Sequence, residues 1–296
     1  MTASATPASL DFLRDWIGRS ERRTDTVTAA PLAGLAATLD RGADPEPLPG
    51  SPVPPLAHWL YFLPQAPHSE LGPDGHPKRG GFLPPVPLPR RMWAGGRLQF
   101  HYALNVGDEI VRHSTITRVD AKQGRSGALV FVTVCHEIGN AQGVAISEEH
   151  DIVYRDHADL SKSASAAPVA PAMAPTDEDF GRTVVPDPVL LFRYSALTFN
   201  GHRIHYDRSY VTAVEGYPGL IVHGPLIATL LVDQVRRELP GAHVRAFTFK
   251  AASPLFDIHP FSVCGRREGN DADGSIALWA RNHEGQLAMQ ARAELA

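Results

Sequence analysis

The feature that most constrains this chain of 296 residues is a helix that is too apolar to lie on the surface. Its pattern predicts a helix over 224–238, which starts at Gly224-Pro225 and is stopped by Pro240. Proline suits the first turn, where its missing N–H is not needed, but it cannot continue a helix. Apolar side chains lie too widely around the axis for a surface helix, so other structure must wrap it. They are Leu226, Ile227, Leu230, Leu231 and Val235.

Segments that alternate apolar and polar residues occur in two sets, one before this helix and one after it. Such alternation is typical of half-buried antiparallel strands. An offset of 149 residues lays Phe100 on Phe249 and Asp108 on Asp257, which indicates a two-fold internal repeat. We expect strands at 110–118, 128–136 and 144–154 in the first set, and at 259–265, 276–282 and 287–295 in the second.

One buried helix followed by antiparallel strands is the order of a hotdog domain, in which a curled sheet wraps a central helix. The 26 prolines concentrate at 45–89 and 161–175, and the second of these regions is typical of a linker. We therefore expect an N-terminal hotdog domain at 1–156, a linker at 157–181 and a C-terminal hotdog domain at 182–296.

Proline obscures the central helix of the first domain, where 57–62 is the only short candidate. A separate helix is expected over 10–17, ending at Gly18. The offset of 149 places Ser51 and Leu56 on the chemically informative Asn200 and His205 of the second domain. We therefore expect the first domain to be non-catalytic and to widen the pocket of the second.

Composition excludes several classes of protein. The net charge is −4 and no Lys/Arg block stands out, which argues against a nucleic-acid platform. There is no apolar run long enough to span a membrane, and the first residues lack the order of a signal peptide. We read Cys135 and Cys264 as reduced core residues and expect a cytoplasmic protein.

The segment from Ser195 to Asp207, followed by His223-Gly224-Pro225, carries the chemistry. It resembles the MaoC-like (R)-specific enoyl-CoA hydratases, whose pattern is Ala-Leu-Ser-x-Asp-x-Asn-Pro-x-His-x-Asp with His-Gly before the helix. Asn200 stands where those enzymes place a catalytic aspartate, and a carboxamide cannot take a proton at neutral pH. The matching residues are Ala196, Leu197, Thr198, His205, Asp207, His223, Gly224, Phe249 and Lys250.

One branch of that superfamily is more similar still: the mesaconyl-C4-CoA (3-methylfumaryl-CoA) and itaconyl-CoA hydratases. The resemblance lies in Phe199–Asp207, in Trp16-Ile-Gly-Arg19 and in Arg79–Trp93, so it extends over nearly the whole chain. It implies an α+β double hotdog of two curled antiparallel sheets, each around a central helix, with the N-terminal helix degenerate. It also implies a hydro-lyase that hydrates a branched C5 dicarboxylyl-CoA.

Hydration of an unsaturated thioester needs a base for water, a proton for the α-carbon and stabilisation of the enolate oxygen. His205 has a suitable pKa range to act as base and then acid. Asn200 could hold the attacking water through its side-chain oxygen. The N–H of Gly224 and the start of the helix could stabilise the thioester oxygen.

Further side chains are candidates for binding the acyl-CoA substrate or bracing the catalytic loop. His202 is open between a substrate hydrogen bond and loop bracing, and His223 is expected mainly to brace. A metal at His202 and His205 lacks a third local ligand, so neither metal nor cofactor is expected. The remaining candidates are cations that could meet the CoA phosphates or a substrate carboxylate: Arg90, Arg91, Arg203 and Lys250.

Alternative functions remain open at this point. An (R)-3-hydroxyacyl-thioester dehydratase on plain acyl chains is the nearest alternative. A hotdog thioesterase or a non-catalytic acyl-CoA-binding module would keep the fold with different chemistry. The expected partner is an acyl-CoA rather than nucleic acid or membrane, and the expected assembly is a homodimer.

Overall fold

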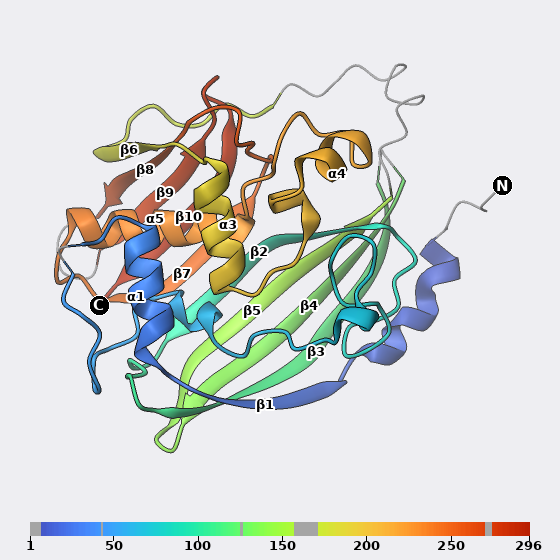
Figure 1. Ribbon diagram of the computed structural model, residues 1–296, viewed down its shortest axis with the longest axis horizontal. Helices are drawn as coiled ribbons and strands as arrows, with labels where there is room; N and C mark the ends of the chain where they lie inside the picture. The colour runs from blue at the N-terminus through green and yellow to red at the C-terminus, as the bar shows by residue number, and fades with distance from the viewer. Residues whose placement is uncertain (1–6, 43, 125–126, 157–170, 270–273) are drawn as a thin grey trace.

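The computed structural model describes residues 7–42, 44–124, 127–156, 171–269 and 274–296. Their strands form one ten-stranded antiparallel sheet in the order β1-β3-β4-β5-β2-β7-β10-β9-β8-β6 (Figure 1). The first half supplies β1 (Ser20–Thr26), β2 (Arg90–Phe100), β3 (Glu109–Gly124), β4 (Gly127–Asn140) and β5 (Gly143–Arg155). The second supplies β6 (Phe180–Val184), β7 (Val244–Ala251), β8 (Phe261–Glu268), β9 (Ser275–Arg281) and β10 (Leu287–Leu295).

The two halves join at an antiparallel pair, β2 with β7, in the middle of the sheet (Figure 1). Leu98 lies opposite Phe247 there, and these two residues are separated by the same 149 positions that relate the repeats. The order of strands outward from this pair is the same in both halves. The expected two-fold repeat is therefore confirmed.

The long apolar helix is α5 (Gly224–Glu238), with the predicted bounds and Pro225 in its first turn. Every residue from Leu226 to Val235 is buried. The helix packs on β8, β9 and β10, so the second half has the expected sheet wrapped around a helix.

Among the residues of the first half that the structure describes, none form an equivalent of α5. The expected helix at 57–62 is only a 3-10 turn, η2 (Ala57–Leu60), because the prolines on both sides allow no longer helix. The proline-rich segment instead packs on the sheet through Val86 and Leu88, which join a core cluster with residues of β3, β4 and β5. The N-terminal helix of the sequence analysis is likewise a 3-10 helix, η1 (Pro7–Trp16).

Two helices that sequence patterning did not predict follow the outermost strands. They are α1 (Ala29–Thr38) after β1 and α3 (Pro188–Leu197) after β6, and they pack against each other (Figure 1). A short 3-10 turn contacts each of these helices: η2 in the first half and η4 (Arg203–His205) in the second. η2 carries a buried histidine, His58, but the offset of 149 residues pairs His58 with Asp207 rather than with His205. That the first half has no counterpart of His205 stays a prediction.

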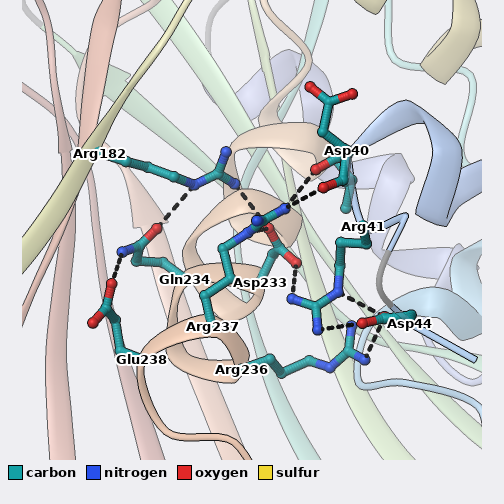
Figure 2. Close-up of polar contacts among 10 residues, drawn as sticks. Asp40, Arg41, Asp44, Arg182, Asp233, Gln234, Arg236, Arg237 and Glu238 are labelled. Atoms are coloured by element: carbon teal, nitrogen blue, oxygen red, sulfur yellow. Dashed lines mark hydrogen bonds and ion pairs between the residues drawn. The ribbon is translucent and has the colours of Figure 1, made fainter.

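A cluster of ion pairs near the C-terminal end of α5 links the two halves (Figure 2). The Asp233 carboxylate is 2% exposed and forms ion pairs with three guanidinium groups, those of Arg41 at 3.0 Å, Arg182 at 2.8 Å and Arg237 at 2.7 Å. Arg41 belongs to the first half, where it also pairs with Asp44. A buried carboxylate requires such partners, which explains how an apolar helix tolerates Asp233.

The predicted strands all occur, and most of them extend further than expected. The strand 287–295 has the predicted bounds. Residues 157–170 of the predicted linker lie outside the described residues. The second half already begins with β6 at Phe180, two residues before the expected boundary.

Candidate active site

The end of α3 sets the position of Asn200. Asn200 N–H donates to the Ser195 carbonyl and Phe199 N–H to the Ala196 carbonyl, the pattern of a Schellman C-cap. Such a cap needs a residue with positive φ, and Phe199 adopts φ +47° although glycine is the usual choice. Strain of this kind is found at functional sites. The Asn200 side-chain oxygen then accepts the N–H of His202 at 3.0 Å, which turns the chain into η4.

His205 is buried, and within the described residues only its Nδ1 makes a hydrogen bond to the protein. Its Nδ1–H donates to the carbonyl of Ile221 at 2.7 Å, which fixes the tautomer and leaves the lone pair on Nε2. Burial lowers the pKa of His205 to about 4, with a further contribution from His76, against the opposing bond to Ile221. The imidazole is therefore neutral at pH 7 and able to accept a proton at Nε2.

His223 lies directly against His205. The two rings stack with centroids 3.7 Å apart and planes 18° apart. His223 Nε2 is hydrogen-bonded to Ser195 Oγ at 2.8 Å, and its Nδ1 has no partner among the described residues. Burial lowers the pKa of His223 as well, so it stacks as a neutral ring. This geometry fits the expected bracing role.

A hairpin from the proline-rich segment docks on the catalytic loop. Leu71 bridges to Pro77, and within this turn Asp74 accepts both the N–H and the Nδ1–H of His76. The ring of His76 lies 4.0 Å from that of His202, whose centroid is 5.4 Å from His205.

Glycines allow this docking. A Cβ on Gly75 (φ +87°) would lie 1.9 Å from the carbonyl oxygen of Gly201, between Asn200 and His202. The Arg203 N–H also donates to the Asp74 carbonyl at 2.9 Å. The first half therefore contributes the 71–77 hairpin to the site of the second.

This hairpin removes the reason given for expecting no metal. Asp74, His76 and His202 can bring ligand atoms within 4.8 Å of one another, so three candidate ligands do exist. Two observations nevertheless disfavour a cation here. The Asp74 carboxylate is already bonded to His76, and the charge of Arg91 acts on both histidines.

Gly224 opens α5 on the same side of the molecule. A Cβ on Gly224 would meet only the carbonyl oxygen of Trp93, at 3.9 Å, so a ligand could approach the backbone here. Pro225 has no N–H, and the first N–H groups of a helix lack intrahelical partners. The helix start can thus offer donors and a partial positive charge to an oxygen.

The predicted cations have different surroundings. Arg90 is paired with Glu215 at 3.2 Å, and Arg203 is paired with Asp207 at 2.8 Å. Lys250 is exposed and lines a groove on the outer face of the sheet, whereas its neighbour Phe249 packs in the core.

Arg91 has no ion pair within the described part of the chain. It is half-buried, lies opposite Tyr154 in the sheet, and its charge reaches His76, His202 and His150. It is therefore the predicted cation that faces the histidines without an acidic partner.

Sequence reasoning missed Asp74 and His76, and it also missed Ser195 as the partner of His223. No local pattern indicates that the hairpin docks 126 residues away from His202. The polar residues Glu148 and His150 did leave a signal, because alternation along β5 places them among Ile146, Ile152 and Tyr154 on the inner face.

Two characterised proteins are similar to this chain over most of its length. The mesaconyl-C4-CoA hydratase of Chloroflexus aurantiacus is 47% identical over 288 residues, covering 97% of this chain and 99% of that protein. The mitochondrial hydroxyacyl-thioester dehydratase type 2 of Schizosaccharomyces pombe is 29% identical over 280 residues, with 83% and 90% covered.

Solved structures confirm the fold. A MaoC-like dehydratase from Phytophthora capsici has a TM-score of 0.67 at 15% identity, covering 97% of this chain and 98% of its own. A Mycobacterium tuberculosis protein with a double hotdog fold has a TM-score of 0.59 at 14% identity, covering 94% and 96%. The chain is thus a double hotdog. The sequence model of one family, hydroxyacyl-thioester dehydratase type 2, matches residues 56–257, and together with the relatives it shows that this chain belongs to that family.

Proposed function

We propose that this protein reversibly adds water to the double bond of an α,β-unsaturated acyl-CoA. The observation that carries the proposal is the state of His205. Its tautomer is fixed by Ile221, its Nε2 makes no hydrogen bond to the described residues, and the ring is neutral at pH 7. A neutral imidazole with a fixed tautomer is the group that general base catalysis requires.

The reaction balances with this single group. His205 Nε2 takes a proton from water as the water oxygen bonds to the β-carbon and the double-bond electrons move toward the thioester. The imidazolium then gives that proton to the α-carbon. Because burial makes this imidazolium a strong acid, its return of the proton is favoured.

Two further groups assist. Asn200 uses one lone pair of its side-chain oxygen for His202, and the second can accept the attacking water. The N–H of Gly224 and the start of α5 would stabilise the negative charge that develops on the thioester oxygen. His202 and His223 hold the His205 ring through the contacts described above.

Arg91 and the relative from Chloroflexus aurantiacus support a substrate class. The relative is named for mesaconyl-C4-CoA, an acyl-CoA with a second carboxylate. We assign a branched C5 dicarboxylyl-CoA, mesaconyl-C4-CoA or itaconyl-CoA, as substrate, with Arg91 receiving the free carboxylate. A buried carboxylate needs such a partner, and the guanidinium can bond both oxygens. Arg90 is less suited because Glu215 already neutralises it.

The test is incubation with crotonyl-CoA and with mesaconyl-C4-CoA, following the absorbance of the conjugated thioester and the release of free thiol separately. A hydratase removes conjugation without releasing thiol, and faster loss with mesaconyl-C4-CoA supports the dicarboxylate. Thiol release would identify a thioesterase, and no change in either signal would indicate a binding module.

The family match favours a second candidate, a dehydratase of 3-hydroxyacyl thioesters with plain acyl chains. A higher kcat/KM on crotonyl-CoA than on mesaconyl-C4-CoA would select it. The proposal includes a cytoplasmic homodimer, and light scattering coupled to size-exclusion chromatography measures the oligomer. No helix among the described residues has the length and apolar character to cross a membrane.

A further inference from the structure

The inner face of the first-half sheet carries a buried carboxylate that the proposed reaction does not use. Glu148 on β5 lies opposite Leu98 of β2 and is 4% exposed. The corresponding position in the second half is Ala293 of β10, because it lies opposite Phe247, the residue that the repeat relates to Leu98. The small side chain of Ala293 belongs to the sheet on which α5 packs. Glu148 therefore extends into the space that a central helix would fill.

Two donors from η2 hold this carboxylate. His58 donates its Nε2–H at 3.0 Å, and Trp59 donates its Nε1–H to both oxygens at 3.1 and 3.2 Å. Burial opposes ionisation, but the hydrogen bond and charge of His58 hold the pKa of Glu148 at about 2. A hydrogen bond to an ionised acceptor is roughly twice as strong as a neutral one, so the Trp59 indole is firmly oriented.

Trp59 belongs to an aromatic wall that reaches the active site. Its ring meets Trp93 edge to face at 4.8 Å and Phe249 at 6.2 Å. The ring of Trp93 lies 3.8 Å from that of His150 at a tilt of 30°, and the Trp93 carbonyl is the atom nearest to the open side of Gly224. An acyl chain that starts at Gly224 and extends into the first half would therefore meet this wall.

We propose that Trp59 closes the inner end of the acyl pocket, and that Glu148 is the positioning residue that keeps it closed, so that the protein accepts short acyl groups and excludes long ones. The inference rests on the proposed function, because it is the acyl group that must enter this pocket. An indole fixed by a buried carboxylate cannot rotate aside to admit more methylene groups. The first half thus selects acyl length without taking part in proton transfer.

The experiment measures acyl-CoA affinity by isothermal titration calorimetry with butyryl-CoA and octanoyl-CoA. Both are saturated and cannot be hydrated, so the result does not depend on catalysis. The wild type is expected to bind butyryl-CoA more tightly. Trp59→Phe removes the N–H and part of the ring, and should shift the affinity ratio toward octanoyl-CoA by about 10-fold or more, as expected when a pocket gains room for a methylene group.

Glu148→Gln is the second variant. It keeps the volume of the side chain and one acceptor oxygen but loses the charge, so it should shift the ratio in the same direction by less. The matched control is Glu137→Gln on β4, whose side chain is exposed, and it should leave the ratio unchanged. Circular dichroism and Tm of each variant check folding, and Glu148→Gln carries the test if Trp59→Phe does not fold.

An unchanged ratio in folded Trp59→Phe and Glu148→Gln would overturn the inference. So would equal affinity of the wild type for both ligands, or a uniform loss for both. Crotonyl-CoA hydration by the wild type is measured in parallel. If it is absent while the affinity ratio shifts as expected, the proposed reaction is wrong and the selection of acyl length stands.

Discussion

Gly75→Ala would test whether the hairpin of the first half is part of the active site. The new methyl group would lie 1.9 Å from the Gly201 oxygen, whereas an ordinary contact needs about 3.4 Å, so the hairpin or the catalytic loop must move by roughly 1.5 Å. Gly201 lies between Asn200 and His202, so this shift would reach the catalytic loop directly. Misplacement by about 1 Å can cost about 10²-fold in rate. We expect kcat/KM on crotonyl-CoA to fall by about that factor.

The matched control is Gly50→Ala. Gly50 has φ +86°, almost the value of Gly75, but a Cβ there would meet nothing within 4 Å. Both variants carry the cost of positive φ, about 1–2 kcal/mol, or roughly 2–3 °C in Tm for a chain of this size. Only Gly75→Ala should also lose activity. Equal activity in the two folded variants would show that docking of the hairpin does not matter to the reaction.

Four more outcomes are expected. His205→Ala should lower hydration by about 10²–10⁴-fold with Tm nearly unchanged, and retention of a tenth of the rate would exclude it as the base. The acid limb of the kcat/KM profile should lie near pH 4, because the pKa of His205 is lowered to about 4 and protonation removes the base; a limb near pH 6.5 would contradict this. Arg91→Met should reduce kcat/KM on mesaconyl-C4-CoA selectively, and equal losses on crotonyl-CoA would assign Arg91 to CoA binding or stability. Asp233→Asn should lower the free energy of unfolding by about 3–5 kcal/mol, or Tm by roughly 5–8 °C. Asp40→Asn is the control and should leave Tm unchanged, because Arg237 donates to the backbone carbonyl of Asp40 and not to its side chain. Similar Tm values in the two variants would contradict the role of the cluster.

Acid should also destabilise the whole chain. Burial lowers the pKa of six histidines, which the unfolded chain would protonate below about pH 6.5. Each then costs up to about 1.4 kcal/mol per pH unit as the pH falls, until it also titrates in the folded state. They are His76, His136, His150, His202, His205 and His223. A Tm that stays constant from pH 7 to pH 5 would refute this reasoning.

Local patterns predicted those parts of the fold that depend on local physics. The helix at 224–238 was predicted with its bounds because proline marks both ends and apolar residues dominate from Leu226 to Val232. In contrast, α1 contains Pro31 and Gly34 and has no polar face to give a helical period. Its stability comes from packing against α3, which no local pattern shows.

The candidate site divides in the same way. Asn200 and His205 lie in one short motif and Gly224 in a second that follows closely, and the structure places all three around η4 and the start of α5. Asp74 and His76 reach the site only because two glycine backbones pack together across the halves. Docking of this kind depends on tertiary geometry, so the sequence offered no means to find it.

The joint between β2 and β7 has a consequence for how such a chain can change. The pair Leu98–Phe247 lies on an approximate two-fold axis between the halves. Rotation by 180° about this axis places the pair Arg97–Thr248 on the pair Ala246–Gln99. The joint is therefore self-complementary, like the interface in a dimer of identical subunits. In such a dimer every substitution appears twice, and a helix lost from one subunit is lost from both. Within a single polypeptide each copy mutates alone. One copy could therefore exchange its central helix for a proline-rich segment while the other kept its helix and its histidine.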